Sequence, residues 1–210
     1  MRIPATIVLA VAATSAWASK DGMYVAAGLS TNSYRGNDSD SFVRIVENER
    51  ATGFRLEIGH IWDLGKPGGF QLGVAGAFDH FGAVSNSKGG TSVDLQASAL
   101  TAYFVIDQVL TEWLDFTFKV GPSGVSYQAE ACCNALGGDI VDERKSRFGT
   151  SAVIGLVFFP TQNIGIELAA QATSWFTGDL RDIEDEDDFY DYLDTRVVAR
   201  SLSASVQYRF

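Results

Sequence analysis

The residues of this chain that could do chemistry are few and lie far apart in the sequence. Its histidines are His60 and His80, and Ser85 and Ser87 follow the second one closely. A serine beside a histidine is the pair that acyl transfer would need, with a third group to orient the base. Phosphate-binding, zinc-protease and serine-elbow motifs are all absent from the sequence. A lone interfacial histidine is the commoner explanation, so we expect no catalytic residue, no cofactor and no enzyme activity.

A dense acidic segment is the strongest polar feature of the chain. Between residues 179 and 194, nine acidic residues accompany a single base, Arg181. Carboxylates are ligands that Ca²⁺ and Mg²⁺ prefer, but the spacing lacks the glycine-containing EF-hand pattern. A charge run of this kind is usually a solvated segment, so we expect no defined metal site but an acidic loop that could attract divalent cations or a partner. The core of the run is Glu184, Asp185, Glu186, Asp187 and Asp188.

Cys132 and Cys133 are neighbours in the chain. Adjacent Cα atoms lie about 3.8 Å apart, which is closer than ordinary disulfide geometry, so a vicinal disulfide here would be strained. Two bonds to another chain are the alternative. One cysteine pair without further ligands supports neither a metal centre nor redox catalysis.

Eight segments of alternating apolar and polar residues must position these groups. The last one, Leu202 to Phe210, alternates without a break, which predicts a strand between two different environments. Each segment reaches the roughly 9 to 11 residues that cross a membrane as a tilted strand. An even number of such strands predicts an all-β fold, an eight-stranded antiparallel up-and-down transmembrane β-barrel. The earlier segments are 23–34, 52–62, 70–81, 92–106, one that starts at Trp113, 147–159 and 164–176.

The polar face of the strands would line the barrel interior. Arg55, Glu57, Lys119 and Glu167 fall on this face, and Glu57, Lys119 and Glu167 lie at comparable depth. An eight-stranded barrel is just wide enough for its side chains to fill it, so we expect these charges to pair as a plug. A gate, in which the partners exchange and open a water path, is the alternative. Further interior charges are expected at Asp79, Asp94, Asp115 and Arg209.

The segment 92–106 is assigned in the same way. Its apolar set, which would face lipid, is Val93, Leu95, Ala97, Tyr103 and Val105, and its interior set is Asp94, Gln96 and Ser98. Aromatic residues with the parity of the apolar face should form belts at the two membrane interfaces. One belt would hold Trp62, Phe70, Tyr103, Phe158, Tyr208 and Phe210, and the other Phe54, Phe78, Phe148 and Phe176.

Short and long connections alternate along the chain. Short ones are predicted at 63–69, 107–112 and 160–163, and longer, polar ones at 35–51, 82–91, 128–146 and 177–195. This alternation is typical of short periplasmic turns and long outer loops. A secreted, soluble barrel is the competing architecture, but its polar face should carry many Lys and Glu residues. Here that face is mostly Gly, Ser, Ala and Thr.

The first eighteen residues have the pattern of a signal peptide. Arg2 precedes an apolar run, and Ala16-Trp17-Ala18 has the small-x-small form of a cleavage site. We therefore expect residues 1–18 to be removed and residues 19–210 to form the barrel domain. The formal charge of −10 makes nucleic acid an improbable partner.

With these features in place, the chain resembles the small bacterial outer-membrane β-barrels typified by OmpA and OmpX. The resemblance rests on the strands, the loop rhythm and the last residues, Tyr208-Arg209-Phe210. It implies a place in the bacterial outer membrane among lipid and lipopolysaccharide, with Tyr208 and Phe210 as a signal for the barrel-assembly machinery.

Function is less specified, because this architecture hosts adhesins, anchors, pores and enzymes. We expect a structural or surface-interaction role through the long outer loops. The alternatives are a narrow gated pore and a lipid A-modifying enzyme, and the oligomeric state is open.

Overall fold

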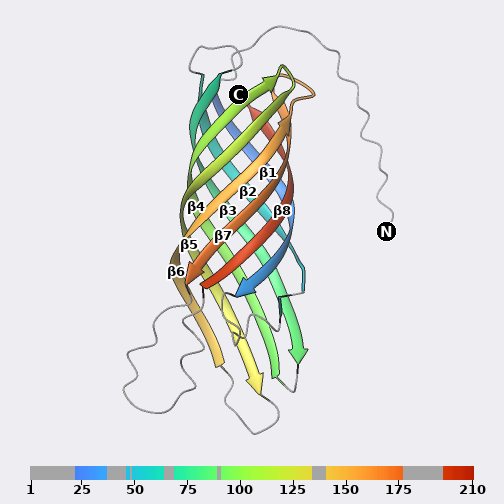
Figure 1. The fold of residues 1–210 in the computed structure, drawn as a ribbon, viewed down its shortest axis with the longest axis vertical. Helices are drawn as coiled ribbons and strands as arrows, with labels where there is room; N and C mark the ends of the chain where they lie inside the picture. Colours follow the sequence, from blue (N-terminus) through green and yellow to red (C-terminus); the bar gives the residue numbers. More distant parts are fainter. Residues whose placement is uncertain are drawn as a thin grey trace, which may run out of the picture.

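The protein is a closed antiparallel β-barrel in the computed structural model, which describes residues 22–36, 46–47, 49–63, 69–88, 91–133, 141–176 and 196–210 (Figure 1). The strands pair in chain order, and β8 pairs with β1 to close the barrel. The predicted fold is thereby confirmed. The strands are β1 (Gly22–Gly36), β2 (Ala51–Trp62), β3 (Phe70–Lys88), β4 (Thr91–Thr111), β5 (Leu114–Cys133), β6 (Val141–Phe158), β7 (Ile164–Phe176) and β8 (Arg196–Arg209).

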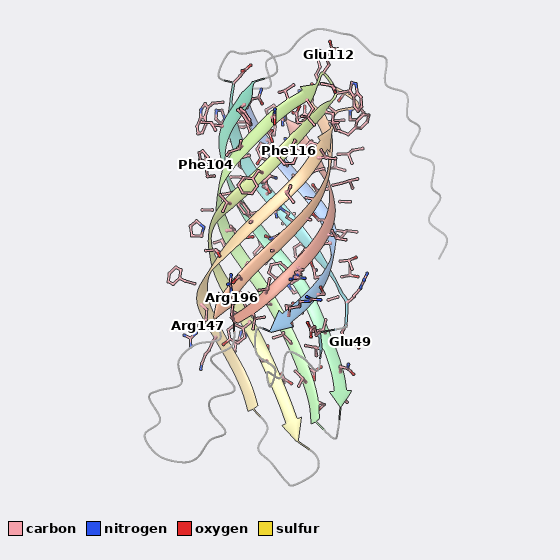
Figure 2. All side chains as sticks on the ribbon, in the orientation of Figure 1. Glu49, Phe104, Glu112, Phe116, Arg147 and Arg196 are labelled. Atoms are coloured by element: carbon pink, nitrogen blue, oxygen red, sulfur yellow. The ribbon has the colours of Figure 1, made fainter. Side chains whose placement is uncertain are left out.

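The two ends of the barrel differ. At the turn end, where the chain enters β1 and leaves β8, β4 and β5 are joined by residues 112–113 and β6 and β7 by residues 159–163. At the opposite, loop end, the connections include 134–140 and 177–195. Figure 2 shows Glu49, Arg147 and Arg196 at the loop end and Glu112 at the turn end, whereas Phe104 lies on the wall between them.

The outer wall is apolar over its middle. Large side chains such as Leu29, Leu100, Leu168 and Leu202 stand about two-thirds exposed. Exposed apolar surface of this extent fits a hydrocarbon surrounding, since each strand also satisfies its backbone hydrogen bonds within the closed sheet. No helix among the described residues is long and apolar enough to cross a membrane.

The predicted aromatic belts are present on this wall with one exception. Tyr103 is 2% exposed and points into the barrel, so its assignment to a belt is wrong. The side chain of Phe176 lies outside the described part of the structure. The remaining belt residues are exposed: Trp62, Phe70, Phe158, Tyr208 and Phe210 toward the turn end, and Phe54, Phe78 and Phe148 toward the loop end.

Strands β3 to β6 extend beyond the others at the loop end (Figure 1). Much of the predicted loops 82–91 and 128–146 is therefore strand, and the connection between β3 and β4 is only residues 89–90. The extension begins at a β-bulge in β3, where the register shifts between His80 and Ala83 and Gly82 has a φ of 76°. Beyond the bulge, Val84 is buried where the earlier parity would have turned it outward.

The prediction for β4 is wrong because it assigned the two faces the wrong way round. Val93, Leu95 and Ala97 are buried, and Asp94 lies on the outer surface. The cause is the length of β4, whose 21 residues run well past a membrane's thickness. In the protruding half, the outer face meets water and the inner face packs a core, so the polarity follows the rule for soluble sheets.

Candidate functional site

A network of charged side chains crosses the middle of the barrel interior. The Lys119 ammonium from β5 lies 2.7 Å from one oxygen of Glu57 on β2 and 2.9 Å from Glu167 on β7. Arg55 forms an ion pair with Glu57 and a second one, at 3.4 Å, with Asp79 on β3. These five residues are at most 5% exposed. Two cations thus hold three carboxylates across the full width of the barrel.

Neutral side chains complete the hydrogen bonding of this network. Tyr24 on β1 donates its hydroxyl to Glu57 over 2.6 Å, and Ser205 on β8 donates to Glu167 over 3.2 Å. Gln171 accepts from Arg55 at 3.0 Å and donates to Asp79 at 3.0 Å. The Arg55 guanidinium also lies 5.1 Å from the ring centre of Tyr103. Buried charges are tolerated at low cost only when they are paired and hydrogen-bonded in this way.

A smaller charged cluster closes the turn end. The Arg209 guanidinium lies 3.2 Å from Asp107 and 3.8 Å from Asp115, and it covers the ring of Phe159 at 4.4 Å. All four residues are buried. This cluster joins β8 to β4 and β5, so it ties the last strand to the opposite wall.

Apolar side chains fill the interior on the loop side of the charged network. Trp175 is 1% exposed, and its ring lies 6.5 Å from that of Tyr34 and 6.3 Å from that of Tyr127. The rest of this cluster is Val46, Ala51, Phe81, Val84, Val93, Leu95, Ala97, Ala99, Val125, Ala129, Val197 and Ala199. A solute would have to cross this apolar layer as well as the charged network.

The structure brings together the four residues expected to pair in the interior, Arg55, Glu57, Lys119 and Glu167. Asp79, Asp115 and Arg209 also lie inside, whereas Asp94 is on the outer surface, where it accepts a hydrogen bond from Ser85.

Sequence reasoning missed the place of Asp107. The alternation of Leu100, Ala102, Phe104 and Ile106 with Thr101, Tyr103 and Asp107 would have revealed it, had the turn-side half of β4 been weighed separately.

The histidines lie on the outer wall. His80 is hydrogen-bonded to Ser98 at 2.9 Å rather than to Ser85 or Ser87, and its ring packs against Phe54 at 5.4 Å. His60 packs against Trp62 at 4.9 Å near the turn end. Among the described residues, no cluster of three or more His, Cys, Asp or Glu side chains could hold a metal ion.

Other predicted sites are only partly described. Cys132 and Cys133 end β5, where their backbone pairs with Ser92 and Thr91, but their side chains lie outside the described part. Residues 1–18 and the acidic run 184–188 also lie outside the described residues. Tyr208 and Phe210 stack edge to face at 5.1 Å on the outer wall.

Comparison with known proteins decides the family. A model of the outer membrane protein beta-barrel domain matches residues 5–210. The chain belongs to this family. As a member of the outer membrane protein beta-barrel family, it resides in the bacterial outer membrane. In barrels of this kind the short turns face the periplasm and the longer loops lie outside.

Solved structures share the fold of this outer-membrane barrel at low sequence identity. Neisserial surface protein A is 16% identical, with a TM-score of 0.51 and coverage of 90% of this chain and 97% of that one. Ail of Yersinia pestis, in complex with the heparin analogue sucrose octasulfate, is 16% identical, with a TM-score of 0.50 and coverage of 90% and 99%. OprG of Pseudomonas aeruginosa is 10% identical, with a TM-score of 0.50 and coverage of 91% and 97%. No curated protein matches the chain.

Proposed function

We propose that this protein is a sealed, non-catalytic outer-membrane barrel that presents its loop end as an interaction surface. The observation that carries the proposal is the filled interior, in which a paired charge network and an apolar layer follow one another along the barrel axis. Each alone would obstruct water and ions, and an eight-stranded barrel leaves little width around them.

The extended strands support the surface role. The outer face of the β3–β6 extension is polar, with exposed Ser85, Asp94, Gln96, Glu130 and Arg144. These strands hold a rigid sheet clear of the membrane, and binding residues are often displayed from such scaffolds. The acidic segment 177–195 joins β7 to β8 at the same end, so a partner or divalent cations would meet it there.

A catalytic role has less support. His80 and Ser98 form a hydrogen-bonded pair of histidine and serine on the outer wall, but no carboxylate among the described residues hydrogen-bonds the His80 ring. Acyl transfer would need that third group to orient the base. We further propose that β8, with Tyr208 and Phe210, is the strand that the barrel-assembly machinery contacts.

Single-channel conductance of the refolded chain tests the seal. Folding and insertion are first verified by the different gel mobility of boiled and unboiled protein. We expect no discrete openings from the wild type, and none from Lys119→Ala, because the apolar layer remains in place. Glu130→Ala, on the outer face of β5, serves as a control that leaves the interior intact. Wild-type openings that Lys119→Ala alters would instead establish a gated pore.

Cell attachment tests the surface role. Bacteria displaying the full chain should attach to a cultured-cell monolayer more than bacteria displaying a chain without residues 179–194. The gel-mobility shift verifies that the shortened chain still forms the barrel. Equal attachment by both strains would show that the acidic segment does not take part in the proposed interaction surface.

A further inference from the structure

A hollow in the outer wall lies over β6, β7 and β8 and reaches Phe118 on β5 and residues 31–33 on β1, with a volume of about 600 Å³. This volume is within the range of about 300–1,000 Å³ usual for small-ligand sites. Its floor is formed by small side chains, Ala152, Ala170 and Ala172, where neighbouring positions of the wall carry Ile154 and Leu202. The hollow therefore breaks an otherwise bulky apolar surface.

The hollow extends from the membrane interface at the loop end of the barrel toward the middle of the membrane. In the strand register, Arg200 pairs with Ala172, and Ala172 pairs with Ala152. Counted from the turn end of its own strand, Arg200 is the tenth residue, Ala152 the seventh and Phe118 the fifth. Since roughly 9 to 11 residues of a tilted strand cross the bilayer, Arg200 lies at the outer interface and Phe118 lies near mid-depth.

Two arginines lie at the loop-end side of this hollow. Arg50 and Arg200 both line it, and both are exposed. Among the described residues, no carboxylate forms an ion pair with either of them, whereas Arg35 is paired with Glu47 and Arg196 donates to Ser174. Two guanidinium groups at one membrane interface favour an anionic headgroup beside an apolar chain.

We propose that this hollow binds the phosphorylated lipid A portion of lipopolysaccharide from the outer leaflet. Arg50 and Arg200 hold a lipid A phosphate, and one acyl chain lies along Ala172, Ala170 and Ala152 toward Phe118. The occupant follows from the location, because a groove in the wall of an outer-membrane barrel faces lipid along its whole length. The guanidinium groups select a phosphate, with which they form bidentate, charge-assisted hydrogen bonds.

A second hollow on the outer wall differs from the first in the charge of its lining. It lies over β2, β3 and β4, has a volume of about 560 Å³, and is lined by residues that include Ile58, Gly76, Ala102 and Phe104. No arginine or lysine lines it, so it offers space for an apolar chain without a partner for a phosphate. This second hollow supplies a matched control for shape without charge.

Native mass spectrometry of the folded full mature chain in detergent micelles tests the site. The probes are bisphosphorylated lipid A, the same lipid A without phosphates, phosphatidylglycerol, and inorganic phosphate alone. We expect bisphosphorylated lipid A to bind the wild type at least about tenfold more tightly than the dephosphorylated form, since hydrogen bonds between guanidinium groups and a phosphate are charge-assisted and stronger than those between neutral groups. Arg50→Gln with Arg200→Gln should remove this preference. Ala172→Phe, which fills the hollow and keeps both charges, should weaken binding about as much.

Two control variants should leave binding unchanged: Arg144→Gln, an exposed arginine outside the hollow, and Ala102→Phe, which fills the second hollow. Equal losses in Arg144→Gln would show a general charge effect and overturn the site. Equal affinity for phosphatidylglycerol, or competition by inorganic phosphate alone, would overturn lipid A as the occupant. The gel-mobility shift verifies folding of every variant. The outcome does not depend on whether the interior is sealed, so this proposal and the proposed function fail separately.

Discussion

Glu57 joins the interior network by accepting hydrogen bonds from three different residues. One of its oxygens accepts hydrogen bonds from Tyr24 and Lys119, and the other accepts from Arg55. Glu57→Gln would turn an amide NH₂ toward a guanidinium or an ammonium group, so that a buried N–H of that group would lose the acceptor it now has. We expect the free energy of unfolding to fall by about 3–5 kcal/mol, as it does when one partner of a buried ion pair is removed. Urea titration of protein folded in lipid vesicles measures it.

Glu130→Gln is the matched control for this prediction. Glu130 lies exposed on the outer face of β5, where it accepts a hydrogen bond from Gln128 at 2.8 Å. A surface change of this kind should stay within about 0.5 kcal/mol. Similar values for the two variants would show that the interior charges contribute little to stability.

The position of this network, though not its contacts, could be predicted at the residue scale. Strand parity places Arg55 and Glu57 inside, two residues apart on one face. Which donors reach Glu57 depends on the register of β2 against its neighbour β1, which carries Tyr24, and on the closure of the whole barrel, which brings Lys119 across from β5. A single sequence fixes parity within a strand but not the register between strands that are distant in the chain.

Among the structural elements, the bulge in β3 determines how the extension leaves the barrel. Gly82 adopts a φ of 76°, and a Cβ atom there would collide with the carbonyl oxygen of Thr52. Tyr34 donates to the Gly82 carbonyl and Asn32 to that of Phe81, each at 2.9 Å. Gly82→Ala should therefore lower the free energy of unfolding by about 2 kcal/mol or more, from left-handed strain and the collision together. Urea titration in vesicles also measures this variant.

Gly76→Ala is the control that distinguishes damage to the bulge from a general effect of replacing a glycine in this strand. Gly76 lies in the same strand, a Cβ atom added there would meet nothing within 4 Å, and its φ is not positive. The added methyl group should leave stability unchanged or raise it slightly, because glycine weakens a strand interior. If Gly76→Ala lowered the free energy of unfolding as much as Gly82→Ala, the bulge would not be the cause of the loss.

The two halves of β4 explain where sequence reasoning succeeded and failed among the elements. Alternation alone identified a strand there, but one rule of polarity was applied along its whole length. Leu100 and Phe104 face outward in the turn-side half, whereas Asp94 and Gln96 face outward in the protruding half. The environment outside the strand changes from lipid to water between these halves, and alternation does not record which solvent lies on which side.

At the scale of the whole molecule, the apolar wall and the filled interior have different tolerances for charge. The interior accepts Arg55 and Lys119 because carboxylates from facing strands surround them. In the part of the chain that the structure describes, the wall offers no such partners over its middle, where Leu56, Leu168 and Leu202 stand exposed to lipid. The cost of a new charge on the wall should therefore depend on its depth in the bilayer.

Leu168→Arg places a charge near the middle of β7 on the lipid face, where the leucine is 61% exposed. We expect a loss of about 2–4 kcal/mol in the free energy of unfolding from lipid vesicles, because the guanidinium must lie at mid-depth in hydrocarbon or distort the bilayer to reach water. Gln96→Arg, on the outer face of the protruding half of β4, should change it by less than about 0.5 kcal/mol, since that position lies in water. Comparable losses from both variants would mean that the bilayer covers the extension, and the β3–β6 sheet could then no longer serve as an exposed surface.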